Sequence, residues 1–385
     1  YRCLFPTPRG TAGFFIHLER FFPMSFMTFL LLAVGLVLLV YGAELLVRGA
    51  SALAVSAGIS PLVVGLTVVA FGTSTPELAV SVLSAWHGQP GIALGNVVGS
   101  NICNVLLILG LSAAVAPLVV ARQVVWLEVP IMIGTSLLLI LFALDGMLVR
   151  WEGALLFAGI IGYTVWTVRR SRRELREQTM AGGDDELPPP SSRSRQLLEI
   201  LGGLVLLGVG SKLLVDGAVT IARHLGVSDL IIGLTIIAVG TSLPELATSV
   251  LASLRGQRDI AVGNVVGSNI FNILTVLGLT TLVAPLPGLP IPLAALTFDL
   301  PVMLAVAVAC LPIFLAGHRI YRWEGLLFLG YYVAYVLFLV LTAIDHDGRY
   351  LLNQAMLWFA LPLTVLTLGL SLWWHYRPGK SWPGR

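Results

Sequence analysis

The stretch that decides the fold is Gly65-Leu-Thr-Val-Val-Ala-Phe-Gly-Thr-Ser-Thr-Pro-Glu77, which is followed by Gly95-Asn-Val-Val-Gly-Ser-Asn-Ile-Cys-Asn104. Both motifs return 168 positions later, as Gly233-Leu-Thr-Ile-Ile-Ala-Val-Gly-Thr-Ser-Leu-Pro-Glu245 and Gly263-Asn-Val-Val-Gly-Ser-Asn-Ile-Phe-Asn272. Aligned without a gap, residues 65–104 and 233–272 are identical at 27 of 40 positions. An internal repeat determines architecture, and paired broken apolar segments in two halves of a chain indicate a transporter's binding site.

The composition places the chain in a membrane. Apolar residues make up 57% of the 385 residues and charged residues only 11%, whereas a soluble protein carries about 25% charged residues. Apolar runs of about 18 residues or more recur, and each is long enough to cross about 30 Å of hydrocarbon as a helix. We therefore predict an all-α polytopic membrane protein. The net charge of +3 does not indicate nucleic-acid binding, because Lys and Arg lie in short loops.

The apolar runs predict two sets of five membrane spans. The first set covers residues 26–47, 60–84, 91–119, 123–144 and 151–169, and the second covers 197–222, 228–253, 259–286, 292–315 and 323–342. An eleventh span, 354–375, has no counterpart in the first half. The chain thus divides into an N-terminal extension (1–23), a first repeat (24–169), a polar linker (170–196), a second repeat (197–342) and an extra C-terminal helix with a tail (343–385). Met24 or Met27 would be a natural start, so the extension is left out of the fold prediction.

The second repeat is predicted to be inverted relative to the first. Leu127-Glu-Val-Pro130 matches Phe298-Asp-Leu-Pro301, and Arg150-Trp-Glu-Gly153 matches Arg322-Trp-Glu-Gly325, so each repeat has five spans. An odd number makes the second repeat enter the membrane from the opposite side. With the linker inside the cell, 16 Lys and Arg residues face the cytoplasm and six face outward. The positive-inside rule therefore predicts that linker 170–196, with its Arg-rich start, is cytoplasmic.

The first motif of each repeat places a carboxylate, Glu77 or Glu245, inside an apolar span. A charged side chain at mid-membrane costs about 2.5–3.5 kcal/mol, which makes it a functional-site hypothesis. Hydroxyls three and four residues earlier share the helix face of each carboxylate; they belong to Thr73, Ser74, Thr241 and Ser242. Pro76 and Pro244 cannot donate a helical N–H bond, so each helix is expected to break there, and such breaks are tolerated at membrane depth only around a cavity or within protein.

The second motif adds more oxygen donors. Ser100 and Asn104 lie four residues apart and can face one point, and the repeat supplies Ser268 and Asn272. No His and no Cys occurs in both copies, and Cys103 and Cys310 are read as small hydrophobes. An all-oxygen set suits hard cations such as Ca²⁺. Two carboxylates balance one Ca²⁺ or two Na⁺.

Other interpretations stay open at this point. Hydroxyls in spans often bond to their own helix, and glycines serve helix packing. A cation channel also uses rings of oxygen ligands, although inverted repeats within one chain favour a transporter. An intramembrane hydrolase would need a metal-binding His pair or a nucleophile and base, and none of the six His residues lies near the motifs. Glu128 and Asp299, each two residues before a Pro, fit an ion path or a structural role.

On these motifs the chain resembles the cation/Ca²⁺ exchanger superfamily, specifically its prokaryotic sodium/calcium exchanger-like branch. The resemblance covers nearly all of residues 26–342. It implies ten helices in two inverted repeats, four ion sites at mid-membrane, and antiport of Na⁺ against Ca²⁺ by alternating access. It also implies an integral protein of a prokaryotic inner membrane that is not an enzyme, whose partners are Ca²⁺, Na⁺ and the lipid bilayer. We expect no cofactor and no obligatory protein partner.

The resemblance assigns ligands by motif. It makes Glu77 and Glu245 the central ligands, with hydroxyls from Thr73, Ser74, Ser100, Thr241, Ser242 and Ser268, an amide oxygen from Asn104, and the carbonyls of Ala70 and Ala238 for Na⁺. Asn272 stands where many sodium/calcium exchangers have Asp, so K⁺ or H⁺ remains an alternative counter-ion. The eleventh span exceeds the family's ten.

Overall fold

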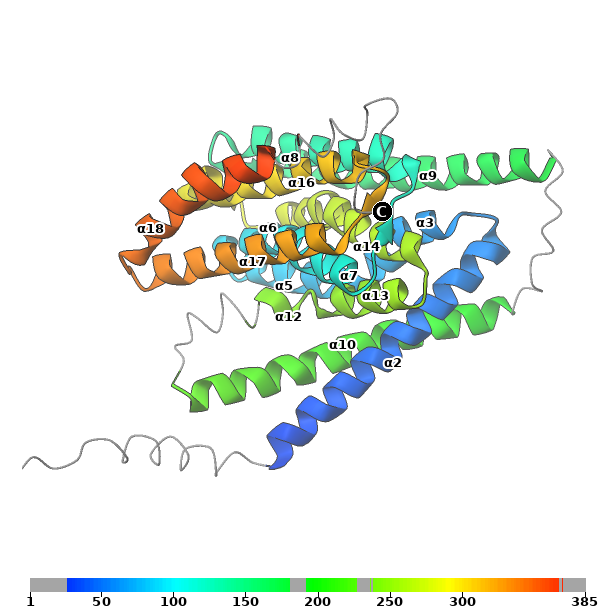
Figure 1. Cartoon of the computed structure of the whole chain (residues 1–385), viewed down its shortest axis with the longest axis horizontal. Helices are drawn as coiled ribbons and strands as arrows, with labels where there is room; N and C mark the ends of the chain where they lie inside the picture. Colours follow the sequence, from blue (N-terminus) through cyan, green and yellow to red (C-terminus); the bar gives the residue numbers. More distant parts are fainter. Residues whose placement is uncertain (1–25, 181–191, 227–235, 237, 367–368, 370–385) are drawn as a thin grey trace, which may run out of the picture.

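The computed structural model describes residues 26–180, 192–226, 236, 238–366 and 369, and these are almost entirely helical (Figure 1). Several predicted segments lie outside the described residues: the N-terminal extension 1–23, the middle of the linker, the start of span 228–253 and the end of the C-terminal tail.

The first repeat contains three spans that are interrupted by π-helical turns, labelled η. Prolines stand in the first turn of α3, α5, α6 and α8, where their missing N–H leaves no helical bond unmade. In chain order the elements are α2 (Phe26–Ala57), α3 (Pro61–Val64), η1 (Gly65–Val69), α4 (Ala70–Thr73), α5 (Thr75–Trp86), α6 (Pro90–Cys103), η2 (Asn104–Leu109), α7 (Gly110–Val115), η3 (Val124–Glu128), α8 (Val129–Ala143) and α9 (Arg150–Met180).

The second repeat follows the same plan, with π-helical turns again after the Gly-Ser-Asn motif and before a Pro-led helix. Its elements are α10 (Arg193–His224), α12 (Ala238–Gly240), α13 (Leu243–Leu254), α14 (Arg258–Phe271), η5 (Asn272–Leu277), α15 (Gly278–Val283), η6 (Ala295–Asp299), α16 (Leu300–Leu315) and α17 (Arg322–Ala343). Two further elements, α18 (Gly348–Ala355) and η7 (Met356–Ala360), begin the segment of the predicted eleventh span, whose end lies outside the described residues.

The predicted spans all have a helix in the structure. Within the described residues, eight helices are long and apolar enough to cross a membrane. A ninth candidate is the pair Pro61–Thr73 and Thr75–Trp86, bent by 44° at its break. The tenth, α13, is a shorter apolar helix whose predicted N-terminal part includes undescribed residues.

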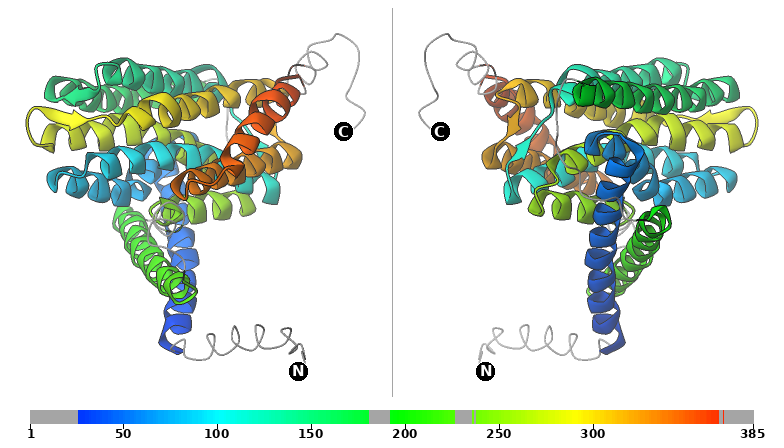
Figure 2. Two further views of the ribbon diagram at one scale, coloured as in Figure 1. Left: turned by 90° about the vertical axis from the view of Figure 1, so that its left-hand side faces the viewer. Right: turned by 90° about the vertical axis from the view of Figure 1, so that its right-hand side faces the viewer.

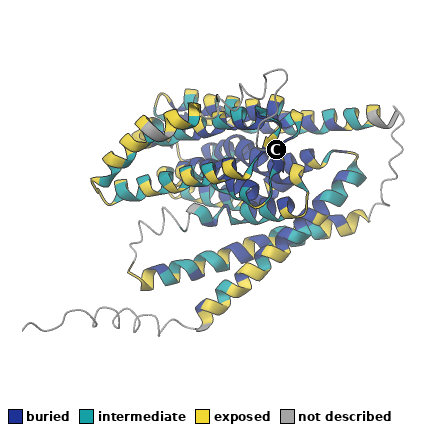
Figure 3. Cartoon of the chain, viewed as in Figure 1, coloured by how far each residue is buried: buried dark blue, intermediate teal, exposed yellow. Residues whose placement is uncertain are grey.

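The helices that carry the second motif form the centre of the bundle. The apolar window of Arg258–Val283 is entirely buried and that of Pro90–Val115 is 72% buried, against 6% for α17. Figure 3 shows this buried centre beneath more exposed outer helices. Helices α2 and α10 cross each other on one side of the bundle, below the other helices in Figures 1 and 2.

Two short antiparallel sheets tie the repeats together. Strand β1 (Leu118–Val119) pairs with β4 (Arg319–Ile320), with Leu118 opposite Ile320. Strand β2 (Met147–Val149) pairs with β3 (Gly288–Pro290), with Leu148 opposite Leu289. Each sheet therefore takes one strand from each repeat, as an approximate twofold relation between the repeats requires.

Glycines allow helices of opposite repeats to cross closely, as expected for membrane helices. A Cβ built on Gly42 of α2 would lie 2.9 Å from the carbonyl oxygen of Gly203 on α10, and one on Gly203 would lie 2.8 Å from that of Gly42. A Cβ on Gly325 of α17 would lie 2.5 Å from the Gly110 carbonyl oxygen on α7. The repeat-related crossing joins Gly153 and Gly278.

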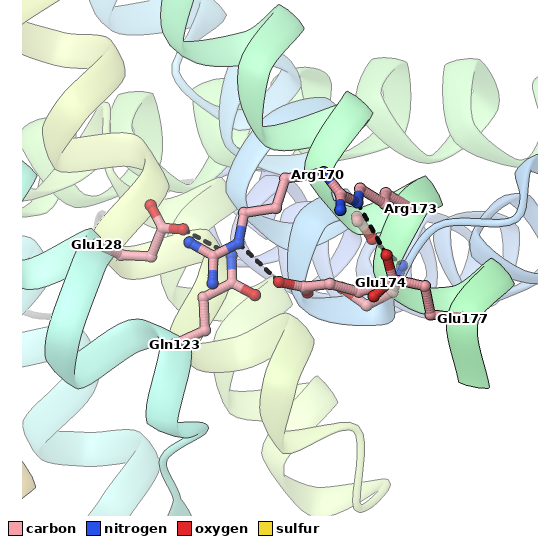
Figure 4. Close-up of polar contacts among 8 residues, drawn as sticks. Gln123, Glu128, Arg170, Arg173, Glu174 and Glu177 are labelled. Carbon is pink, nitrogen blue, oxygen red and sulfur yellow. Dashed lines mark hydrogen bonds and ion pairs between the residues drawn. The ribbon is translucent and has the colours of Figure 1, made fainter. Parts of the chain in front are cut away.

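The two ends of the polar linker are helical, although the composition of residues 170–196 predicted a disordered or solvated segment. Helix α9 continues to Met180 and α10 begins at Arg193. Arg–Glu pairs four residues apart, which stabilise an exposed helix, explain the difference: Arg170–Glu174 (2.7 Å), Arg173–Glu177 (2.8 Å) and Arg195–Glu199 (3.1 Å). Figure 4 shows the first two pairs.

The α7–α17 crossing gives a stability prediction. Gly325→Ala would place a Cβ against the Gly110 backbone, and such overpacking costs about 1–3 kcal/mol. We expect a lower Tm for the purified variant in detergent. The matched control is Gly330→Ala on the same helix, where a Cβ meets nothing within 4 Å. Its Tm should stay level or rise, since Ala favours a helix over Gly; equal Tm losses for both variants would contradict the proposed crossing.

Candidate ion-binding site

The first motif breaks its helix as predicted and places a carboxylate just after the break. Ser74, with φ −82° and ψ 8°, separates α4 from α5, and Glu77 lies in the first turn of α5. Ser242, with φ −90° and ψ 8°, precedes α13 in the same way, and Glu245 lies in its first turn. Each carboxylate thus stands at a helix N-terminus, where the helix dipole stabilises negative charge. Both side chains are fully buried.

The serines of the first motif bind the carboxylate of the opposite repeat. The Ser74 hydroxyl donates to Glu245 Oε1 (3.1 Å), and the Ser242 hydroxyl donates to Glu77 Oε1 (3.0 Å). The sequence predicted each serine on the helix face of its own carboxylate, but the break between them turns the serine toward the other repeat. The two halves of the site are therefore bonded to each other across the repeat interface.

The second motif adds contacts from α6 and α14. Ser100 donates to Glu77 Oε1 at 3.4 Å, and its hydroxyl oxygen lies 3.1 Å from that of Ser242. The Asn104 amide donates to Asn269 Oδ1 and the Asn272 amide donates to Asn101 Oδ1, both at 3.0 Å. These hydrogen bonds again join the two repeats. Because each uses the amide nitrogen, the Oδ1 atoms of Asn104 and Asn272 remain available to an ion.

Five oxygens of the predicted ligands have no hydrogen-bond partner in the part of the chain that the structure describes. Each of the five side chains is at most 1% exposed. Leaving a buried acceptor unpaired costs about 1–3 kcal/mol, and more for a charged group, so a bound cation would offset a large penalty. The five atoms are Glu77 Oε2, Glu245 Oε2, Asn104 Oδ1, Asn272 Oδ1 and Ser268 Oγ.

Two asparagines that the sequence interpretation did not single out hold the carboxylate segments in place. The Asn96 amide donates to the Glu77 carbonyl (3.1 Å) and to Ser81 (2.9 Å), and Asn264 makes the related bonds to the Glu245 carbonyl (3.4 Å) and Ser249 (2.9 Å). Their recurrence in both Gly-Asn-Val-Val motifs was the signal available in the sequence.

The predicted threonine ligands bind these asparagines. Thr73 donates to Asn264 Oδ1 (3.1 Å) and Thr241 donates to Asn96 Oδ1 (3.3 Å), so each threonine also reaches the opposite repeat. The Ala70 carbonyl accepts from the Ser74 N–H at 3.0 Å, and its oxygen lies 3.4 Å from the Thr73 hydroxyl oxygen. Ala238 begins α12, and its side chain lies outside the described residues.

Four further carboxylates in the helices have partners away from this network. Glu128 accepts from Tyr163 (2.7 Å) and Gln123 (2.8 Å), and Figure 4 shows it beside Gln123 and Arg170. Asp299 accepts from Tyr335 at 3.3 Å, which is the repeat-related contact. Glu152 and Glu324 accept backbone N–H groups at the starts of α9 and α17. These contacts favour a structural role for all four.

The donor set suits a hard cation. The oxygens that meet between the repeats come from carboxylates, amides and hydroxyls, the ligand types that Ca²⁺ takes in sets of 6–8. Within the described residues, no group of three or more His, Cys, Asp and Glu side chains is placed to hold a metal. Two carboxylates supply a formal charge of −2 where the bilayer offers no counter-charge.

Comparisons with known proteins show which family the chain resembles as a whole. A family model described as sodium/calcium exchanger protein matches residues 27–169 and 196–341. The putative antiporter CaxA of Alkalimonas amylolytica is 45% identical over 281 residues, which are 72% of this chain and 87% of that protein. The sodium/calcium exchanger MaX1 of Methanosarcina acetivorans is 36% identical over 352 residues, covering 82% and 99%. A structure of the sodium-calcium exchanger NCX_Mj soaked with Na⁺ and Sr²⁺ superimposes with a TM-score of 0.70 at 32% identity, covering 82% of this chain and 99% of that one.

Proposed function

The chain belongs to the sodium/calcium exchanger protein family, and from that premise we propose that it is a secondary antiporter that exchanges Ca²⁺ for Na⁺ at a site between its two repeats. One observation carries the assignment of the site. Glu77 and Glu245 are fully buried, and each has one carboxylate oxygen bonded to the opposite repeat and the other oxygen unpartnered in the described part of the chain. The protein is an integral membrane protein, and we assign it to a prokaryotic inner membrane.

In this proposal the carboxylates carry the charge and the neutral oxygens complete the coordination. The unpartnered oxygens of Asn104, Asn272 and Ser268 join the carboxylates around Ca²⁺. Ser74, Ser100 and Ser242 hold the carboxylates and can reorient toward Na⁺, since a hydroxyl both donates and accepts. Thr73 and Thr241 orient the asparagines that hold the broken helices. The carbonyls of Ala70 and Ala238 lie just before the breaks and are assigned to Na⁺.

The inverted repeats supply the mechanism of exchange. A site between two repeats of opposite orientation can open to either side when one group of helices moves against another. Helices α2 and α10 cross through small residues and are less buried than the central helices α6 and α14, so this crossing pair is the candidate for the group that moves. Because the ligands come from both repeats, an ion must be bound before the repeats can close around the unpaired carboxylate oxygens at low cost. This design favours an exchanger over a channel.

Neutralising either central carboxylate should abolish exchange. Glu77→Gln and Glu245→Gln keep the shape of the side chain but remove a charge that offsets the ion, and breaking a buried charge pair costs about 3–5 kcal/mol. We expect Na⁺-driven ⁴⁵Ca²⁺ uptake into proteoliposomes to fall below about 1% of the parent rate. Glu324→Gln is the matched control, since Glu324 is equally buried but bonds a helix start, and its uptake should persist. Normal uptake by either central variant would show that its residue does not belong to the site. Uptake driven equally well by a K⁺ or H⁺ gradient would show that the exchange is not specific to Na⁺.

The side chain at position 272 should set how tightly the site binds Na⁺. The present site, with charge −2, balances one Ca²⁺ or two Na⁺, and a third Na⁺ would leave uncompensated charge at low dielectric. Asn272→Asp adds a carboxylate, so we expect half-maximal exchange at a lower Na⁺ concentration than in the parent. The measurement is Ca²⁺ flux against Na⁺ concentration for both proteins. Superimposable curves would mean that residue 272 does not face the ions.

We also propose that the linker 170–196 lies in the cytoplasm. The Arg-rich end of α9 is the strongest positive-inside signal in the chain. Asp185→Cys in a background without Cys3, Cys103 and Cys310 should react with a membrane-impermeant thiol reagent only after the cells are opened. Labelling of intact cells would place the linker outside.

A further inference from the structure

Three helix ends surround a basic cavity that the exchange mechanism does not use. The cavity has a volume of about 420 Å³ and lies between the end of α2, the extension of α9 and the start of α10. Two hydrogen bonds hold these ends together: Ser56 donates to Gln196 Oε1 at 2.7 Å, and the Ser60 N–H donates to the Ser171 hydroxyl at 2.9 Å. The cavity walls therefore come from three helices that are tied to one another.

The cavity combines an apolar floor with two arginines. Leu53, Ala57, Leu197 and Ile200 supply the floor, and Arg172 and Arg193 line it from α9 and α10. Neither arginine has an ion-pair partner among the described residues, whereas the neighbouring Arg173 and Arg195 are each paired with a glutamate four residues later. Arg172 also lines a second cavity of about 300 Å³ together with Arg169, Arg173, Arg176 and Glu177. Four arginines against one glutamate leave an excess of positive charge here.

An apolar stripe leads from this cavity along α10. Leu197, Leu201 and Val205 are spaced four residues apart and are 57%, 52% and 64% exposed. Side chains at this spacing share one helix face, and the stripe runs from the arginines into the membrane-spanning part of α10. A ligand that fits both features has an anionic head and an apolar chain, because basic pockets between membrane helices on the cytoplasmic side bind acidic headgroups.

We propose that this cavity is a binding site for an anionic phospholipid. Its headgroup phosphate pairs with Arg172 and Arg193, and an acyl chain lies on the α10 stripe. With the linker in the cytoplasm, as proposed above, the lipid comes from the inner leaflet. Bound there, it connects α9 to the crossing pair α2 and α10.

Thermal unfolding of the purified full chain tests this inference without any transport assay. Phosphatidylglycerol added to the detergent should raise the Tm by on the order of a few degrees, because a ligand that binds only the folded state stabilises it. Phosphatidylcholine and free inorganic phosphate should each produce a smaller shift or none. The double variant Arg172→Ala/Arg193→Ala should lose the phosphatidylglycerol increment, and the control Arg195→Ala should retain it.

Three outcomes would overturn the proposal. A full increment in the double variant would place lipid binding elsewhere. An equal increment with inorganic phosphate would make the site one for a free anion. Glu174, Glu177 and Glu199 are nearby acidic residues that are already paired with arginines, and the linker adds Asp184, Asp185 and Glu186. If the increment appears only after these three linker residues are changed to Asn, Asn and Gln, the linker rather than a lipid occupies the cavity.

Discussion

The structure has to bury two carboxylates between its two repeats. Glu77 and Glu245 each gain a helix N-terminus from a proline-led break and a hydroxyl from the opposite repeat. These contacts use only one oxygen of each carboxylate. In the proposed function a cation relieves the free-energy cost that remains at the second oxygen, so the burial that destabilises the fold would also drive ion binding.

The repeat geometry follows from this pairing. Each element that orients a carboxylate has a counterpart 168 residues away, and the bonds cross: Thr73 to Asn264 and Thr241 to Asn96, Asn104 to Asn269 and Asn272 to Asn101. Neither repeat is complete alone, since its polar groups find partners in the other. Outside this network, glycine crossings and two short sheets join the repeats through backbone contacts that leave little room for side chains.

Much of this architecture could be predicted from the sequence because duplication appears directly as a repeated pattern. A helix in each predicted span, the helix breaks just before Pro76 and Pro244, and the buried carboxylates all followed from hydropathy and motif spacing. The partner of each polar side chain did not follow: spacing places Ser74 on the face of Glu77, but only the fold shows that it bonds Glu245. Asn96 and Asn264 were missed because an amide next to glycine in an apolar span resembles a packing residue. The helical ends of the linker were missed because composition was weighed above the Arg–Glu spacing.

The central claim is that Ca²⁺ and Na⁺ share one site built from both repeats. Equilibrium binding of ⁴⁵Ca²⁺ to the purified chain, measured as Na⁺ replaces choline at constant ionic strength, tests it most directly. The account predicts a single Ca²⁺ per chain that Na⁺ displaces completely, with a dependence on Na⁺ steeper than first order, because more than one Na⁺ is needed to balance two carboxylates. Ca²⁺ that stays bound at saturating Na⁺ would contradict it.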